Sequence, residues 1–405
     1  MARRVPYVAG LDVGDNKTCA LVCRPLEGGK LEVIGLGVAE SRGWRKGSIN
    51  DFDSAVLSIR KAVEAAEDTA GLSVDAVFVG VGGLDLRGVD STGGVSLGLR
   101  ARPVTADDIR RVFEAAQCVS LPAERRVLHA ERQEYLLDSQ NGIRNPVGMV
   151  GTRLEACVHL VTASTLAHEN IVTAVNRAGI EVKDTVLEPL AAAEACLTPD
   201  ERELGVALLD IGRGSSELVV YHEGSLRHTA AIPVGGEYFT SDVAVGLRTP
   251  VPEAERLKIA WTNGEVADPE AGIEVPSVGG RPPRVVYGTM LREILEPRAA
   301  ELVELTADEL TRSHLERQLG AGLVMVGGGA KLSGLVRMAE QALEVPVRIG
   351  QPNGLDNMGE LLPDPAFATA VGLVLYGNRR RLLQGSTETG WTDRLRQMFR
   401  SGGDN

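Results

Sequence analysis

Two related stretches of the chain indicate its fold: Ala9-Gly-Leu-Asp-Val-Gly-Asp-Asn-Lys-Thr-Cys-Ala-Leu-Val22 and, 198 residues later, Ala207-Leu-Leu-Asp-Ile-Gly-Arg-Gly-Ser-Ser-Glu-Leu-Val-Val220. In each, an apolar run typical of a buried strand ends in Asp-x-Gly, a polar turn follows, and a second apolar run returns. A glycine-rich turn comes later in each half, at 81–88 and 326–334. The same two features in the same order predict a duplicated α/β domain.

The first half contains a segment that breaks the α/β rhythm. Residues 84–163 combine a helix opened by Thr105-Ala-Asp-Asp with two alternating, strand-like segments, which predicts a small α+β module inserted into the first domain. In the second half, residues 264–283 are rich in Gly, Pro and acids and are predicted to be irregular. A long helix is predicted over 289–305.

Composition limits the classes of function. The 405 residues carry 43 Lys and Arg against 55 Asp and Glu, a formal net charge of −12. This acidity argues against a general nucleic-acid-binding protein, which needs cationic surface to displace phosphate counterions. The longest apolar stretch, 367–377, is far shorter than the roughly 20 residues that span a bilayer. With no signal-peptide pattern and five scattered cysteines, the sequence predicts a cytoplasmic protein with reduced thiols.

The paired hairpins have the chemistry of a phosphate site. Their glycines let backbone N–H groups approach phosphate oxygens. Asp12 and Asp210 come at strand ends that face each other in a duplicated fold, where two carboxylates could hold hydrated Mg²⁺. Lys17 adds a positive charge nearby. Either hairpin alone could be an ordinary tight turn, and it is the matched pair that favours a nucleotide between two domains.

Two further segments carry candidate site residues. Glu188 follows a short apolar strand and opens an alanine-rich helix, where a carboxylate could orient an attacking water. An ordinary acid at a helix amino terminus is the alternative. Glu255 and Lys258 lie three residues apart on one predicted helical face. They suit ribose hydroxyl contacts or, equally, a solvated ion pair.

These motifs resemble the actin/chaperone/sugar-kinase ATPase superfamily and stand in its order: phosphate-1, connect-1, phosphate-2 and adenosine. Within the superfamily, the chain resembles the FtsA family, the bacterial actin homologues of cell division. The resemblance extends over essentially the whole chain and includes the strings Lys46-Gly-Ser-Ile-Asn-Asp51, Thr240-Ser-Asp-Val-Ala244, Ala254-Glu-Arg-Leu-Lys258 and Ile294-Leu-Glu-Pro-Arg298.

The resemblance implies ATP and Mg²⁺ as ligands, held between duplicated ribonuclease-H-like domains. Asp12 and Asp210 would lie near the metal, and Glu188 would position water. The residues that would surround the nucleotide are Gly14, Asp15, Asn16, Lys17, Gly212, Arg213, Gly214, Ser215, Ser216, Glu255, Lys258, Gly327, Gly328 and Gly329. Arg298 and Glu301 fall where FtsA receives the carboxy-terminal tail of the tubulin homologue FtsZ, although an intrahelical ion pair explains them equally well.

The implied domains follow the same order along the chain. They are 1–83 with 164–200 for the first actin-like domain, 84–163 for the inserted division-specific subdomain, 201–377 for the second domain with a smaller subdomain at about 237–310, 378–390 for a linker, and 391–400 for a membrane-targeting helix.

The phosphate-2 loop departs from the superfamily pattern. Arg213 replaces a small residue, Ser215-Ser216 replaces the usual threonines, and Glu217 stands where Asp is common. Arg213 either contacts a phosphate or crowds the loop, and the sequence leaves both open. We therefore expect ATP binding with slow or no hydrolysis.

The final segment has the pattern of an interfacial membrane helix. Placed at 100° per residue, its apolar side chains share one arc and arginines flank or oppose it. The members are Trp391, Leu395, Met398 and Phe399 on the apolar arc, with Arg394, Arg396 and Arg400 around it. A terminal helix docked on the core is the alternative. Residues 379–405 hold six arginines and three acids, a local charge of +3 against −15 for 1–378, which predicts a cationic tether to anionic lipid.

Together these features predict an ATP-bound, self-assembling adaptor that anchors FtsZ polymers to the inner face of the cytoplasmic membrane at the division septum and recruits later division proteins. Two alternatives share the nucleotide loops: another actin-like adaptor, such as the pilus-assembly protein PilM, and a soluble sugar-kinase-like phosphotransferase.

Overall fold

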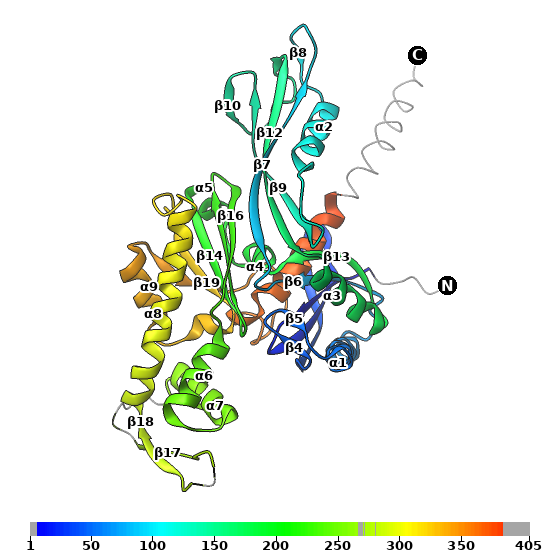
Figure 1. Ribbon diagram of the computed structural model, residues 1–405. Coiled ribbons are helices and arrows are strands. Elements are labelled where there is room, and N and C mark those ends of the chain that lie inside the picture. The colour runs from blue at the N-terminus through cyan, green and yellow to red at the C-terminus, as the bar shows by residue number, and fades with distance from the viewer. Residues whose placement is uncertain (1–5, 266–269, 271, 280, 384–405) are drawn as a thin grey trace.

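The computed structural model describes residues 6–265, 270, 272–279 and 281–383, and these form two lobes with a third module above them (Figure 1). The first lobe is built on a five-stranded sheet of order β13-β6-β1-β2-β3. Its strands are β1 (Val8–Val13), β2 (Lys17–Pro25), β3 (Leu31–Glu40), β6 (Ala76–Val81) and β13 (Glu181–Leu187). The other elements of this lobe are α1 (Phe52–Ala70), α3 (Thr165–Arg177), α4 (Glu188–Cys196), the small hairpin β4 (Trp44–Arg45) and β5 (Ser48–Ile49), and the 3₁₀ turn η1 (Glu27–Gly29).

The second lobe repeats this sheet. Its order is β16-β15-β14-β19-β20, with an antiparallel β14–β15–β16 meander and β19 and β20 parallel to β14, as β6 is parallel to β1 in the first lobe. Its elements are α5 (Pro199–Leu204), β14 (Val206–Ile211), β15 (Ser216–His222), β16 (Ser225–Ile232), β19 (Gly322–Val326), η2 (Gly328–Lys331), α9 (Leu335–Leu343), β20 (Val347–Ile349) and η3 (Pro365–Phe367). The predicted duplicated α/β fold is therefore confirmed.

A smaller helical subdomain extends below the second lobe (Figure 1). It contains α6 (Gly236–Leu247), α7 (Val251–Thr262), the hairpin β17 (Gly272–Val275) and β18 (Arg284–Tyr287), and α8 (Gly288–Arg312). Two predictions differ here: the segment expected to be irregular contains β17, and the long helix runs to Arg312. The hairpin forms because Val275 and Val286 are buried in the core of this lobe.

The inserted module stands at the top of Figure 1 as a four-stranded antiparallel sheet of order β10-β9-β12-β7 with one helix against it. The elements are β7 (Arg87–Ser96), β8 (Arg102–Pro103), α2 (Ala106–Gln117), β9 (Arg125–Leu137), β10 (Gln140–Ile143), β11 (Val150–Gly151) and β12 (Arg153–Ser164). Thr105 caps α2 in a reciprocal box with Asp108, as its sequence predicted. The module has its own hydrophobic core between α2 and the sheet.

The last described helix spans residues 368–383 and shows that the predicted start of the linker, at residue 378, is wrong. Residues 378–383 are helical, so an independent spacer begins no earlier than residue 384. Arg379 pairs with Glu194 at 2.8 Å and Arg380 with Asp184 at 2.9 Å, both on the first lobe. The predicted charge of +3 for the tail changes as well. Once 379–383 are counted with the body, residues 384–405 contain three arginines and three acids and have no net charge.

Candidate nucleotide site

A cavity of about 360 Å³ lies between the two lobes, and both Asp-x-Gly hairpins open into it. The turns of the two hairpins are closed in the same way. The Gly14 N–H donates to the carbonyl of Lys17 at 3.1 Å, and the Gly212 N–H donates to the carbonyl of Ser215 at 3.0 Å. The repeat seen in the sequence therefore becomes two matching turns on the walls of one cleft.

Nearly all of the predicted nucleotide residues line this cavity. They are Asp12, Gly14, Asp15, Asn16, Lys17, Glu188, Asp210, Gly212, Arg213, Gly214, Ser215, Glu255, Lys258, Gly327, Gly328 and Gly329. Ser216 is the exception: it is buried in β15, and its hydroxyl donates to the carbonyl of Val234 at 2.7 Å.

Four buried carboxylates line the cleft: Asp12, Glu188, Asp210 and Glu217. Burial raises the pKa of Asp210 to about 6 and that of Glu217 to about 8. Burial, reinforced by the charge of Glu217, raises the pKa of Glu188 well above its ordinary value. The protein alone thus concentrates acidic groups here that a bound cation would relieve.

Glu217 has one oxygen in use and one without a partner. Its Oε1 accepts a short hydrogen bond from the N–H of Gly83, while its buried Oε2 has no hydrogen-bond partner in the structure. A buried unpaired carboxylate oxygen is costly unless something else satisfies it. This orphaned oxygen is consistent with a cleft shaped for a polar ligand.

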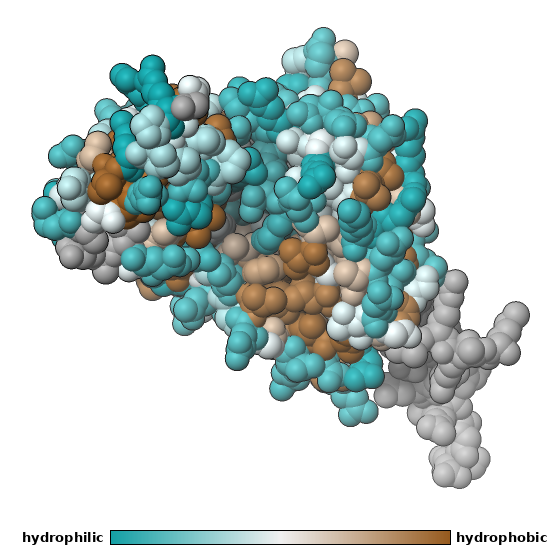
Figure 2. All heavy atoms as spheres, turned by 90° about the horizontal axis from the view of Figure 1, so that it is seen from below, coloured by the Kyte–Doolittle hydropathy of each residue, from teal (hydrophilic) through white to brown (hydrophobic). Residues whose placement is uncertain are grey.

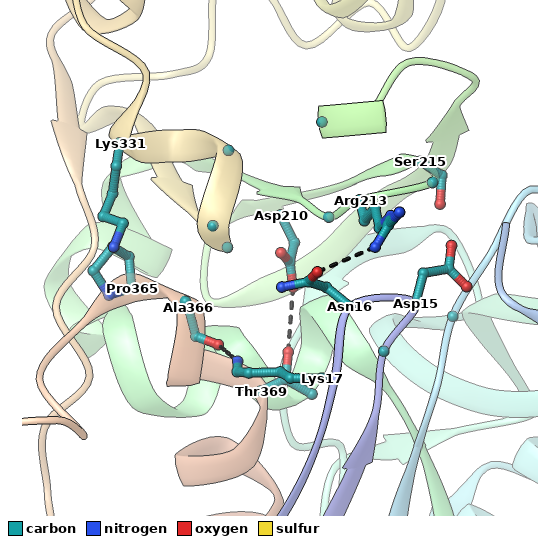
Figure 3. Close-up of a pocket in the computed structure, with 18 of the residues that line it drawn as sticks. Asp15, Asn16, Lys17, Asp210, Arg213, Ser215, Lys331, Pro365, Ala366 and Thr369 are labelled. Carbon is teal, nitrogen blue, oxygen red and sulfur yellow. Dashed lines mark hydrogen bonds between the residues drawn. The ribbon is translucent and has the colours of Figure 1, made fainter. Parts of the chain in front are cut away.

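Asp210 is fixed by neighbours from distant parts of the chain. Thr369, in the last described helix, donates from its hydroxyl to Asp210 Oδ2 at 3.2 Å (Figure 3). Gly327, with a φ of 80°, approaches so closely that any Cβ there would strike the other carboxylate oxygen of Asp210. Glycine is therefore required behind this carboxylate.

Lys17 lies beside the carboxylates. Its amine donates to the carbonyl of Ala366 and lies 4.2 Å from the centroid of the Phe367 ring (Figure 3). Its positive charge opposes the pKa increase that burial imposes on Asp12.

Polar residues of the two hairpin turns form another part of the cavity lining. Asp15 Oδ1 accepts from the N–H of Gly47 at 3.1 Å, and Arg213 Nη1 donates to Asn16 Oδ1 at 3.2 Å across the cleft (Figure 3). The Arg213 side chain therefore reaches the opposite lobe.

The far wall carries the predicted ribose residues. Lys258 Nζ lies 2.8 Å from Glu255 Oε2 and donates to the carbonyl of Gly236 at 3.1 Å. The Lys258 charge holds the Glu255 pKa below its usual range against the effect of burial. The two side chains form an ion pair, but a partly buried one rather than the solvated pair of the alternative interpretation, and they also line the cavity.

Sequence reasoning did not assign several cavity residues, among them Glu217, Gly47, Gly82, Ala366 and Thr369. Glu217 could have been predicted from the sequence, since it stands within the second hairpin, directly opposite Asp210 in the strand pairing. Thr369 could not have been predicted from a local pattern, because it lies 159 residues away from Asp210 in the chain.

Within the described segments, no three His, Cys, Asp or Glu side chains are grouped closely enough to hold a metal ion by themselves. Mg²⁺ is usually bound by one or two carboxylates and keeps several waters. Asp12 and Asp210 line the same cavity, and together with the orphaned oxygen of Glu217 they fit a hydrated Mg²⁺ bound with a phosphate ligand.

The predicted partner and membrane residues lie elsewhere. Arg298 on α8 forms ion pairs with Glu301 and with Asp242, the latter at 2.7 Å. The whole amphipathic segment 391–400 falls outside the described residues. Among the helices that are described, none combines the length and the hydrophobicity needed to cross a bilayer.

Comparison with known proteins decides the family. The family model of cell division protein FtsA matches residues 207–372, and that of the SHS2 domain inserted in FtsA matches residues 83–162. The cell division protein FtsA of Pseudomonas aeruginosa is 44% identical over 376 residues, 92% of this chain and 90% of its own. The chain belongs to the FtsA family of cell division proteins.

Other FtsA relatives agree across a wide range of bacteria. Those of Escherichia coli and Bacillus subtilis are 38% and 37% identical, covering 93% and 94% of this chain and 91% and 85% of their own. Among solved structures, the PilM-PilN type IV pilus biogenesis complex has a TM-score of 0.65 at 17% identity, over 92% of this chain and 99% of that one. MreB5 of Spiroplasma citri bound to ADP has a TM-score of 0.54 at 13% identity, over 96% of this chain and 99% of that one. At these identities the structural likenesses show the shared actin-like fold.

Proposed function

We propose that this FtsA-family protein binds ATP with Mg²⁺ in the interlobe cleft. The two matching hairpin turns on opposite walls of one cavity carry the proposal. The backbones of 14–17 and 212–215 would hold the phosphates, Asp12 and Asp210 the hydrated metal, and Gly327 to Gly329 the adenosine. Proteins of the same fold have been solved with ADP and with AMPPNP.

Glu255 and Lys258, which lie side by side on the cavity wall, would contact the ribose hydroxyls. When bound, Mg²⁺ supplies positive charge that offsets the phosphates. The orphaned Glu217 oxygen and the glycine wall behind Asp210 support this fit.

We propose that ATP turnover is slow, because the phosphate-2 loop departs from the superfamily pattern at Arg213, Ser215-Ser216 and Glu217. Glu188, the acid that would position the attacking water, is buried beside Glu217, and this burial raises its pKa well above its ordinary value. ATPase measurements against pH test this, and turnover at the rate of a fast ATPase at pH 7 would contradict it.

We propose further that the protein assembles into actin-like filaments and tethers FtsZ polymers to the cytoplasmic face of the inner membrane at the septum, where the inserted subdomain recruits later division proteins. The family and the amphipathic pattern of 391–400 support the tether. Since residues 384–405 have no net charge, the apolar arc rather than charge would supply most of the lipid affinity. Weak binding by one short helix would be strengthened by several copies in a filament.

Vesicle co-sedimentation tests the tether. The intact chain and a chain that ends at Gly385 are compared on phosphatidylglycerol-containing vesicles, with Trp391→Glu to interrupt the apolar arc. We expect the intact chain alone to pellet with vesicles. Equal pelleting of the three proteins would remove the membrane function.

Binding of the FtsZ tail is tested on α8. We expect Arg298→Glu to weaken capture of an FtsZ carboxy-terminal peptide, because Arg298 and Glu301 mark the proposed contact. Arg292→Glu is the matched control, since Arg292 lies on the same helix and also pairs with a glutamate. Equal weakening by both variants would point to a general charge effect and against this site.

A further inference from the structure

Two pairs of side chains join the lobes beside the hairpin turns. The first is the hydrogen bond from Arg213 Nη1 to Asn16 Oδ1, which joins the turn of the second hairpin to that of the first. Both side chains line the cavity, and Figure 3 shows the bond between them. An exposed contact of this kind is weak and breaks readily.

The second pair is Lys46 and Tyr238. Lys46 lies in the turn between β4 and β5 of the first lobe, and Tyr238 lies on α6 of the smaller subdomain. The Lys46 amine donates to the Tyr238 hydroxyl at 2.9 Å and lies 5.1 Å from the centroid of its ring. A hydrogen bond and a cation–π contact thus join the same two side chains.

The backbone on each side brings these contacts together. The N–H of Gly47 is bound to Asp15, so the Lys46 turn is attached to the first hairpin. Gly214 lies against the same turn, since a Cβ there would come within 2.7 Å of the Lys46 Cα and would collide with Asp15. The two hairpins and the Lys46 turn therefore form one continuous wall.

Tyr238 is also held from within its own subdomain. The guanidinium carbon of Arg298 lies 5.6 Å from the Tyr238 ring centroid, and Arg298 is in turn fixed by Asp242. The ring is thus placed between a cation of the first lobe and a cation of the second. Tyr238 on α6 therefore has a fixed position from which to meet Lys46.

We propose that the pairs Arg213–Asn16 and Lys46–Tyr238 form a latch between the lobes, and that opening this latch limits nucleotide release. The proposal rests on nucleotide binding in the cleft, as proposed above. The latch lies on the wall formed by the hairpin turns, so a nucleotide held by those turns leaves faster when the lobes separate. Tyr238 does not line the cavity, so it acts through the position of the lobes and is a positioning residue.

Release kinetics test the latch. Fluorescent N-methylanthraniloyl-ADP is bound with Mg²⁺ to the full chain, and its release is followed after an excess of unlabelled ATP is added. We expect Tyr238→Ala and Arg213→Ala each to raise the release rate by about two- to fivefold, from the usual strength of such contacts. The double variant should exceed either, and Tyr238→Phe, which keeps the ring and loses the hydroxyl, should fall between Tyr238→Ala and the unsubstituted protein.

Tyr287→Ala is the matched control, because Tyr287 is a partly exposed tyrosine of the same subdomain. Unchanged release in both latch variants, with labelled ADP still bound, would overturn the latch and leave nucleotide binding standing. Failure of the unsubstituted chain to bind labelled ADP would overturn the proposed function instead.

Hydrogen exchange without nucleotide tests the latch independently. We expect Tyr238→Ala to speed amide exchange in residues 43–49 while exchange in the inserted module stays unchanged. Unaltered exchange in 43–49 would overturn the latch. An increase throughout the chain, together with a lower unfolding temperature, would indicate a purely structural role and would overturn it as well.

Discussion

The strand pairing of the two hairpins shows how one residue changes the chemistry of the cleft. Asp12 pairs with Cys19 across the first hairpin, and Asp210 pairs with Glu217 at the equivalent place in the second. The thiol of Cys19 is buried and its pKa is raised to about 12, so it stays neutral. The additional acid of the cleft therefore comes from the second hairpin.

Asp210→Asn tests the role of that carboxylate. We expect the affinity for ATP with Mg²⁺ to fall at least about tenfold, because the carboxylate charge that holds the hydrated ion is lost. Affinity measured with EDTA should change much less. Titration calorimetry measures both, with Asp200→Asn on the surface helix α5 as control, and an equal loss with and without Mg²⁺ would contradict a metal role.

His129 provides a prediction about pH and stability. Its Nε2 accepts from the N–H of Leu187 at 2.9 Å, and burial lowers its pKa to about 4. Between pH 6.5 and 4 the unfolded chain takes up a proton that the folded chain does not, so this contribution to stability is complete above pH 6.5 and is lost as pH falls.

We therefore expect His129→Gln, which keeps an acceptor for Leu187, to reduce the loss of stability on acidification. The difference in slope should approach about 1.4 kcal/mol per pH unit within this window. Urea unfolding at several pH values measures it. Parallel pH profiles for the two proteins would show that His129 is not the group responsible.

At the scale of elements, two helices pack closely against each other between the lobes. Helix α4 follows β13 of the first lobe, and helix 368–383 begins beside Asp210 and passes over α4. They approach so closely that a Cβ on Gly372 would collide with the carbonyl of Ala191. Only glycine permits this crossing.

Gly372→Ala should accordingly destabilise the protein by about 1–3 kcal/mol, the usual cost of overpacking, or more if the helices cannot separate. Denaturant unfolding measures the change. Gly328→Ala is the control for stability, since a Cβ there would meet open space. Similar stability of both variants would show that the crossing can relax.

At the scale of the whole molecule, the end of the last described helix changes where positive charge lies. Arg379 and Arg380 form ion pairs with the first lobe, so their charges belong to the body of the protein. Figure 2, seen from below, shows apolar residues gathered in the middle of that face among mostly hydrophilic neighbours. Exposed apolar surface of this kind is common where proteins meet partners.

The whole molecule also connects the proposed partner site to the cleft. Arg298 contacts Tyr238, and Tyr238 contacts Lys46 on the other lobe. A carboxylate-bearing peptide that engages Arg298 would compete with the Tyr238 ring. We expect an FtsZ tail peptide to raise the release rate of labelled ADP about twofold or more, in line with the weak contacts involved.

The peptide should have no such effect on Arg298→Ala, in which this contact is already absent. Stopped-flow release with and without peptide gives the comparison. An equal acceleration in both proteins would place the coupling elsewhere, and peptide binding without acceleration would separate the partner site from the latch.

The sequence by itself determined the duplicated fold, the inserted module and most of the cleft residues, because Asp-x-Gly turns, caps and apolar periodicity depend on neighbours along the chain. Only the tertiary structure decided which groups act on one another. Thr369 meets Asp210, Glu217 meets Gly83, and Arg380 meets Asp184, each across more than 130 residues. Burial then set the pKa values of the acids, and neither contact nor burial across such distances is encoded in a local pattern.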